Sequence, residues 1–152
     1  MIVYRLDLET PSTPKPVPEG ACIIVSGIGG VLKNFAIWVR NWGWKEAIKA
    51  ALKVLSRRRV LFHCVVNGKT VVQSGWANFG FCRYYPVEKN AVVLGTLYTR
   101  PEYRSRGYAT AAKGQVIKYL YHRGFTRFYA DTTPANLPAQ RTIEKLGFQR
   151  IA

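Results

Sequence analysis

The chain has few acidic residues, few histidines and few cysteines, and each shortage limits what it can do. Eight Asp and Glu stand against 23 Lys and Arg in 152 residues, a formal net charge of +15. The histidines are His63 and His122, and the cysteines, Cys22, Cys64 and Cys82, form no Cys-x-x-Cys pair. Structural zinc sites and disulfide frameworks both need more ligands at more regular spacing. We therefore expect reduced thiols and no metal site.

A long uninterrupted apolar run is also missing. Ala21–Val39 is apolar enough to be tested as a membrane span, but Lys33 lies inside it and three glycines interrupt it. A lysine in the middle of a bilayer costs a few kcal/mol. The first residues also lack the basic-then-apolar order of a signal peptide. These features predict a cytoplasmic protein without a membrane span.

The residues that are present are those of a globular domain with an anion-attracting surface. Hydrophobic residues make up 48% of the chain and aromatic residues 13%, which is enough for one core in a single domain. The positive charge attracts phosphorylated small molecules, nucleic acid or acidic headgroups, and charge alone does not choose between them.

The first ninety residues alternate strand and helix signals. Hydrophobic spacing and turn residues predict a strand over Met1–Leu8, a proline-rich connection over Thr10–Gly20 and a strand over Ala21–Ser26. A flexible glycine turn follows, then a helix over Val31–Arg40, a break at Asn41–Trp44 and a helix over Trp44–Arg59. Strands over Val60–Val66 and Thr70–Trp76 and a loop over Gly80–Asn90 complete this half. Asn67-Gly68 between the last two strands is a strong hairpin signal.

The helix over Trp44–Arg59 carries two stripes. One is apolar and is expected to be the buried face: Trp44, Ile48, Ala51, Leu52 and Leu55. The other is basic and is expected to face solvent, as a plain surface or as a guide for an anionic substrate: Lys45, Lys49, Lys53 and Arg57.

The second half predicts a regular alternation. It reads as a strand over Ala91–Thr99, a turn over Arg100–Tyr108, a helix over Ala109–His122, a strand over Phe125–Ala130, a turn over Thr132–Pro138, a helix over Ala139–Leu146 and a last strand over Phe148–Ala152. The whole order is that of a mixed α/β (α+β) fold.

The most informative junction lies where the strand Ala91–Thr99 leads into a helix. Its residues are Arg104-Ser105-Arg106-Gly107-Tyr108-Ala109-Thr110. Unpaired amides at a helix amino terminus bind phosphate oxygens, and a glycine lets the backbone approach closely. Arginines add charge-assisted contacts, so the junction predicts a pyrophosphate site. A basic surface turn is the alternative for this motif taken alone.

A second signature follows one strand later, and the two together resemble a known family. Asn136-x-x-Ala139 opens a short helix that ends in Glu144-Lys145-Leu146-Gly147-Phe148. With the Arg-x-x-Gly-x-Ala loop, this resembles the GNAT superfamily of acyl-CoA N-acyltransferases. The resemblance covers residues 91–152, whereas residues 1–90 agree only in the order of their elements.

The resemblance implies a fold and a set of ligand contacts. The fold would be one domain, 1–152, with a central twisted, mostly antiparallel sheet flanked by helices. Its residues 1–90 would form the variable acceptor-side half and its residues 91–152 the acyl-CoA half. Contacts to acetyl-CoA would come from Leu97, Thr99, Arg104, Ser105, Arg106, Gly107, Tyr108, Ala109, Thr110, Asn136 and Arg141. For Asn136, a helix N-cap is an equally good use.

The sequence departs from the family where proton transfer is concerned. Ile143 stands where many relatives carry a tyrosine, and Val93 where some carry a catalytic glutamate. An amine must still lose a proton before it attacks a thioester. The remaining candidates are Tyr98, Glu88, Asp131 and His63. The chain also ends soon after Gly147, where relatives have a further strand, so the sheet is either shortened there or completed by a partner.

The function expected from these observations is transfer of an acyl group, taken to be acetyl, from acyl-CoA to a primary amine of an anionic small molecule or peptide. Two alternatives stay open: a catalytically inactive module of this fold that binds nucleic acid or another polyanion, and an acyltransferase whose donor is an acyl carrier protein. The chain lacks a recognisable nucleic-acid motif, which disfavours the former. A homodimer is left open.

Overall fold

The computed structural model describes residues 1–56 and 58–152, apart from the side chain of Thr96. Along the chain the elements are β1 (Ile2–Asp7), β2 (Ala21–Val25), α1 (Gly27–Leu55), β3 (Arg59–Val66), β4 (Thr70–Phe79), β5 (Val92–Thr99), the 3-10 turn η1 (Pro101–Tyr103), α2 (Tyr108–Tyr121), β6 (Arg127–Thr132), α3 (Leu137–Lys145) and β7 (Gln149–Arg150). This is the expected mixed α/β fold.

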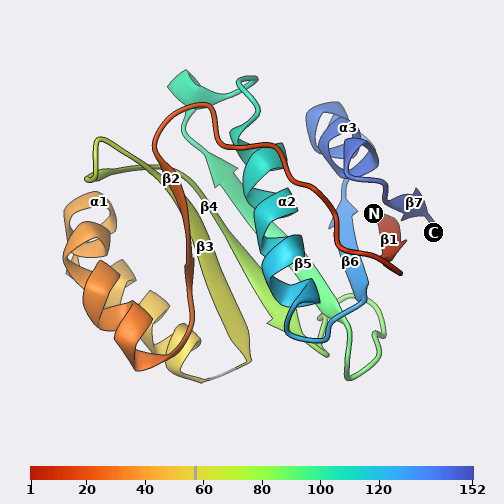
Figure 1. Ribbon diagram of the computed structural model, residues 1–152, viewed down its shortest axis with the longest axis horizontal. Helices are drawn as coiled ribbons and strands as arrows, with labels where there is room; N and C mark the ends of the chain where they lie inside the picture. The colour runs from red at the N-terminus through yellow and green to blue at the C-terminus, as the bar shows by residue number, and fades with distance from the viewer. Residues whose placement is uncertain (57) are drawn as a thin grey trace.

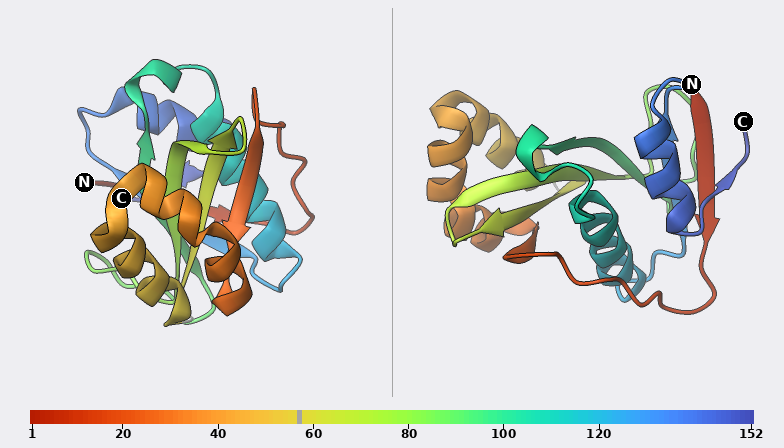
Figure 2. Two further views of the ribbon diagram at one scale, coloured as in Figure 1. Left: turned by 90° about the vertical axis from the view of Figure 1, so that its left-hand side faces the viewer. Right: turned by 90° about the horizontal axis from the view of Figure 1, so that it is seen from above.

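One twisted sheet of seven strands runs through the molecule in the order β2-β3-β4-β5-β6-β1-β7 (Figure 1). All its neighbouring pairs are antiparallel except β5 and β6, which are parallel. α2 and α3 cover one face, and α1 covers the β2–β4 part of the other (Figure 2). Alternation along β3 shows the two faces, because Phe62 packs in the α2 core while Leu61 packs in the α1 core.

The amino-terminal strand lies far from the strand that follows it in sequence. β1 pairs with β6 along its whole length, from Ile2 opposite Thr132 to Asp7 opposite Arg127, and short β7 pairs with the outer edge of β1. The edge of β6 is therefore covered by the chain's own first strand, without a partner molecule. The proline-rich connection then crosses over α2, where Pro14 packs against Gly114 (Figure 1).

Helix α1 contains the predicted interruption, but it begins earlier than expected. Gly43 has non-helical dihedrals, φ 83° and ψ 168°, which divide α1 into two halves. The glycine cluster expected as a flexible turn is instead the first turn of the helix, directly after Ser26. A side-chain carbon at Gly30 would lie 3.0 Å from Val25, so the absence of one lets this turn pack closely on β2.

The buried face of the second half of α1 is not the predicted one. The side chains that pack against the sheet are those of Ala47, Ala50 and Val54. Trp44, which was expected inside, is 67% exposed, and Leu52 is 64% exposed. Both sets recur at three- and four-residue steps, so periodicity alone could not separate them. The small alanines allow the closer approach of helix to sheet.

The basic stripe points outward as predicted. Lys45, Lys49 and Lys53 are all exposed, and Lys53 lies over the ring of Trp76 with its ammonium 5.5 Å from the ring centre. Arg57, the last member of the predicted stripe, lies outside the described residues.

Two other features bear on expectations from the sequence. The predicted hairpin is present, with Asn67 at φ 55° and Gly68 at φ 67° between β3 and β4. Among the described residues, no helix is long and apolar enough to cross a membrane.

Candidate active site

Strand β5 separates from β6 part-way along its length. The two strands pair only from Val92 opposite Phe128 to Leu94 opposite Ala130, although β5 continues to Thr99. Against β4, Trp76 is opposite Gly95 and Ser74 is opposite Tyr98, so β5 carries one extra residue, a β-bulge. The bulge bends the end of β5 away from β6, as Figure 1 shows.

The bend leaves backbone groups of β5 without a neighbouring strand on one side. The amide of Arg100 donates to the carbonyl of Val72 in β4 at 2.8 Å. Because successive residues of a regular strand direct their backbone groups to opposite edges, those of Thr99 point toward the side where β6 has left, whereas Leu97 lies in the bulge, where this alternation is interrupted. This is the orientation that the expected contact of Thr99 with the pantetheine arm requires.

The loop after η1 presents free amides at the start of α2. The first helical hydrogen bond of this turn runs from the amide of Ala111 to the carbonyl of Gly107 at 3.0 Å, so the preceding amides of the helix have no partner within it. No side chain of the described residues caps this end. Ser105 at φ 61° and Gly107 at φ 92° both adopt left-handed backbone, which is typical of turns whose successive amides bind an anion. The residues present fit a pyrophosphate.

Gly107 also leaves room for such a group. A side-chain carbon built there would meet nothing within 4 Å, so the space in front of the loop is open. Tyr108 is buried against the core and anchors the first turn, whereas Ala109 and Thr110 are half-buried beside it. The core therefore anchors one side of the loop through Tyr108, and the other side, at Gly107, is open to a ligand.

The arginines of the loop are on its outer side. Arg104 donates from Nε to the carbonyl of Thr99 at 3.0 Å, which ties the loop to the end of β5. Arg106 lies with its guanidinium carbon 5.4 Å from the ring centre of Tyr103 and is exposed. Both arginines belong to the turn that carries the free amides.

Helix α3 supplies the second motif. Its N-cap is Asn136, whose Oδ1 accepts a hydrogen bond from the amide of Ala139 at 3.2 Å, so the capping role is present. Arg141 is exposed on the same helix. Ile143 is 1% exposed and packs in the core, which is a structural role.

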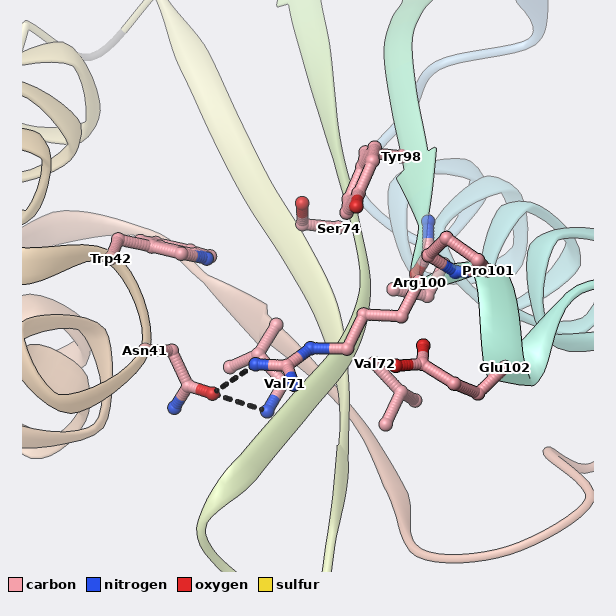
Figure 3. A pocket seen from close by; sticks show the side chains of 10 residues that line it. Asn41, Trp42, Val71, Val72, Ser74, Tyr98, Arg100, Pro101 and Glu102 are labelled. Atoms are coloured by element: carbon pink, nitrogen blue, oxygen red, sulfur yellow. Dashed lines mark hydrogen bonds between the residues drawn. The ribbon is translucent and has the colours of Figure 1, made fainter.

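A cavity of about 290 Å³ opens beside the end of β5 (Figure 3). It is lined by Asn41, Trp42, Val71, Val72, Gln73, Ser74, Tyr98, Arg100, Pro101 and Glu102. Arg100 extends across it and donates from Nη2 to Oδ1 of Asn41 at 3.1 Å. The same oxygen accepts from the amide of Val71 at 3.0 Å, so Asn41 joins the kink of α1 to the β3–β4 hairpin.

Comparison with known families agrees with this geometry. Residues 55–148 match the family described as Acetyltransferase (GNAT) family. The chain belongs to the GNAT family of acetyltransferases. It is therefore an acyltransferase of the N-acetyltransferase type, with acetyl-CoA as its co-substrate. None of the curated proteins matches the sequence.

Solved structures share the fold at low identity. The aminoglycoside N-acetyltransferase AAC(6')-Iy in complex with CoA is 19% identical, with 90% of this chain and 93% of that chain covered and a TM-score of 0.62. AAC(6')-Ih from Acinetobacter baumannii is 17% identical, with 87% and 95% covered and a TM-score of 0.57. The GCN5-related N-acetyltransferase from Sphaerobacter thermophilus is 14% identical at a TM-score of 0.65. The match covers 99% of this chain but 48% of that chain.

The four acid/base candidates of this GNAT chain are placed in four different surroundings. Tyr98 lines the cavity, is 55% exposed, and lies opposite Ser74 on the neighbouring strand. Asp131, near the end of β6, accepts a hydrogen bond from the hydroxyl of Tyr85 at 2.9 Å. His63 is fully buried beneath α1 and accepts from the indole of Trp38, so it cannot reach a substrate.

Glu88 lies toward the opposite end of the sheet, in the loop that precedes β5. Its carboxylate accepts from Tyr129 at 2.8 Å and from Arg127 at 2.8 Å. A hydrogen bond from its own backbone amide, together with these two, lowers the pKa of the carboxyl. A lowered pKa makes a weaker base, so the surroundings of Glu88 favour a structural role.

Sequence reasoning missed several groups in this region. Asn41, Arg100 and Glu102 meet at the cavity only because α1, β4 and η1 converge there. Lys113 is 3% exposed on the inner face of α2, and burial lowers its pKa to about 8 while the charge of Asp131 opposes that shift. The signal for Lys113 was its position within the apolar face of Ala112, Val116 and Ile117.

Proposed function

We propose that this GNAT acetyltransferase moves the acetyl group from acetyl-CoA to a primary amine of an anionic small molecule or peptide, which binds in the cavity beside β5. The observation that supports this proposal is the guanidinium of Arg100, which lies within that cavity next to the end of β5. A guanidinium binds carboxylate or phosphate by charge-assisted hydrogen bonds. The net charge of +15 adds a field that attracts such acceptors.

The donor would be held by the second half of the chain. The free amides from Ser105 to Thr110 would bind the pyrophosphate, with Arg104, Arg106 and Arg141 as further phosphate contacts. Leu97 and Thr99 would pair through their backbone with the pantetheine arm, and Asn136 would reach it from α3. A backbone amide of the bent part of β5 would stabilise charge on the carbonyl oxygen.

Two cavity residues would handle the protons. As the amine nitrogen bonds to the acetyl carbon, its proton would pass to the carboxylate of Glu102, directly or through water. As the carbon–sulfur bond breaks, Tyr98 would donate its hydroxyl proton to the departing thiolate and regain one from solvent. Asp131 remains a second acceptor for the amine proton, since it stands near the end of β6, where the two strands have separated.

The experiment is a panel of amines assayed with acetyl-CoA by release of the free thiol. Anionic acceptors, such as a nucleotide-linked amino sugar and a peptide with acidic residues after its amino terminus, should be turned over. A polycationic aminoglycoside should not be, because Arg100 and the overall field repel it. Turnover of the aminoglycoside alone would refute the anionic acceptor.

The same purified protein can be used to test the two alternative functions, a polyanion-binding module and an acyltransferase with a carrier-protein donor. Tight binding of duplex DNA or RNA at physiological salt, without turnover of any amine, would favour a polyanion-binding module. Transfer from an acetylated carrier protein but not from acetyl-CoA would favour a carrier donor.

A further inference from the structure

Large apolar side chains are exposed in a row along α1. Before the kink, Ile28 is 64% and Leu32 73% exposed, and after it Trp44, Ile48 and Leu52 are 67%, 48% and 64% exposed. In the left view of Figure 2 the outer side of α1 faces the viewer, and no other helix or strand of the described residues lies in front of it. Exposed apolar side chains gathered on one element mark a surface that binds something.

The two halves of the row are joined at the kink. Ile28, Leu32 and Phe35 recur at helical steps before Gly43, and Trp44, Ile48 and Leu52 do so after it. The ring centres of Phe35 and Trp44 lie 5.7 Å apart in an edge-to-face contact. We name six residues the α1 strip: the exposed Ile28, Leu32, Trp44, Ile48 and Leu52, and the half-buried Phe35 that joins the two halves.

Basic residues border the α1 strip on the side away from the sheet. At 100° per residue, Lys33 and Arg40 in the first half and Lys45 and Lys49 in the second follow the apolar row around the helix. Lys53 turns back toward the sheet, where its ammonium lies over the ring of Trp76 in β4. All of them are exposed. Glu46 is the acidic residue of α1, and it is paired with Lys49 at 2.8 Å. The surface is therefore apolar along its centre and cationic along its margin.

We propose that the α1 strip and its lysines bind the surface of an anionic phospholipid bilayer, with the apolar side chains in the headgroup region and the lysines on the lipid phosphates. A helix with an apolar row beside a basic one is the pattern of interfacial membrane association, and tryptophan is enriched at that depth. The helix lies along the surface and does not span it.

A second copy of the chain would bind the α1 strip less well than an anionic bilayer. Two α1 strips packed together would bring their rows of lysine close to each other, with Glu46 as the sole opposite charge on each helix. Net charges of +15 on both copies would oppose the same encounter. An anionic surface removes both penalties.

The position of the strip connects it to the proposed active site. Trp42 lines the cavity and Trp44 opens the second half of the strip, one residue on either side of Gly43. A protein bound to a bilayer through the strip would hold the cavity close to the lipid phosphates. In combination with the proposed function, this favours an anionic amine carried on or near the membrane as acceptor.

Sedimentation with vesicles tests the binding without any acetyl donor, so its failure would leave acetyl transfer untouched. Wild type should bind vesicles of phosphatidylcholine mixed with phosphatidylglycerol, should not bind phosphatidylcholine alone, and should bind less as salt rises. Ile48→Gln/Leu52→Gln should weaken binding by about tenfold or more by removing apolar contact. Lys33→Gln/Lys45→Gln should weaken it similarly by removing charge.

Matched controls remove the same groups elsewhere on the surface. Lys89→Gln/Lys145→Gln and Phe81→Gln/Ile151→Gln alter exposed residues outside α1 and should stay within about threefold of wild type. All four variants change exposed side chains, so their melting temperatures should match wild type within a few degrees. Equal binding by strip and control variants, or none by wild type, would overturn the proposal. A dimer of wild type in gel filtration that Ile48→Gln/Leu52→Gln dissociates would instead assign the strip to a second copy.

Discussion

The indole of Trp38 donates a hydrogen bond of 3.0 Å to Nε2 of His63, and both side chains are fully buried between α1 and β3. An accepting Nε2 requires a neutral imidazole with its proton on Nδ1. That Nδ1 has no partner among the described residues. Protonation of His63 would therefore destroy the contact with Trp38 and leave a buried charge.

Stability should consequently fall in mildly acidic solution. Burial lowers the pKa of His63 from 6.5 to about 4. Above pH 6.5 the histidine is neutral in both states, but between pH 6.5 and 4 the unfolded chain binds the extra proton, so the free energy of unfolding decreases as pH falls. The loss reaches about 2 to 3 kcal/mol at pH 4. Urea unfolding at several pH values measures it.

His63→Gln is the control for this dependence, because its amide oxygen can still accept from Trp38. The variant should be less stable than wild type at pH 7 but should lose less stability between pH 6.5 and 5. A slope equal to that of wild type in this window would show that other groups carry the pH dependence.

Gly107 should be indispensable for binding the donor. A ligand that binds only the folded state raises the melting temperature by mass action, so saturating acetyl-CoA should stabilise wild type. Gly107→Val places a branched side chain at φ 92°, in the open space before the free amides, and should abolish the shift. Gly68→Val is matched to it, since Gly68 also has positive φ and open surroundings but lies in the β3–β4 hairpin. That variant should be destabilised yet keep the shift, whereas loss of the shift in both would remove Gly107 from the donor site.

The second half of the chain was predictable because its signals are local. The turn from β5 into α2 and the cap of α3 depend on residues adjacent in sequence, such as Gly107 and Asn136, and both elements form where expected. Of the two faces predicted for the second half of α1, the prediction was wrong for the buried face only, because Ala47 and Leu52 belong to equally periodic rows. Which row is buried is decided by how closely the helix can approach the sheet.

Long-range placement was beyond the sequence. Nothing near Tyr4 in the chain specifies that β1 pairs with β6, more than a hundred residues away. The cavity has the same origin, since Asn41 and Arg100 come from elements that meet only in the folded molecule. Local motifs predict the donor site, whereas the cavity proposed for the acceptor is formed only by the tertiary structure.

Truncation of Tyr4 should test the role of the first strand. Tyr4 is 1% exposed in the core beneath α3, and its hydroxyl donates to Glu144 at 3.3 Å. Tyr4→Ala should cost about 3 to 5 kcal/mol in unfolding free energy, as other buried aromatic truncations do. Tyr4→Phe removes only the hydroxyl and should cost about 1 kcal/mol. Chemical denaturation compares them, and equal costs would show that packing of the ring contributes little.

Lys113 should destabilise the fold at neutral pH. Burial lowers its pKa to about 8, so below pH 8 the ammonium is charged in both states and its desolvation opposes folding. As pH rises from 8 toward 10.5 the folded lysine loses its proton first, and this penalty is relieved. Lys113→Met should therefore be more stable than wild type at pH 7, by about 1 to 3 kcal/mol, with a smaller rise above pH 8. Lower stability of the variant would mean that the ammonium has a favourable partner.

Arg100 should control affinity for the acceptor and leave the donor unaffected. Its guanidinium lies in the cavity with one hydrogen bond to Asn41, which leaves donors for an anionic group. Arg100→Ala should raise the KM for an anionic acceptor by about tenfold or more, the value of a charge-assisted contact, and the KM for acetyl-CoA should change by less than about twofold. Arg83→Ala removes an exposed arginine from the loop before β5 and is the matched control for net charge. It should leave the KM for the acceptor and the KM for acetyl-CoA unchanged. Asn41→Ala removes the contact that positions the guanidinium and should also raise the KM for the acceptor, but it removes the hydrogen bonds to Lys69 and Val71 as well, so its melting temperature must be compared with that of wild type. An Arg100→Ala variant with an unchanged acceptor KM would move the acceptor site away from this cavity. An equal rise in the KM for acetyl-CoA would show that the residue acts through the end of β5.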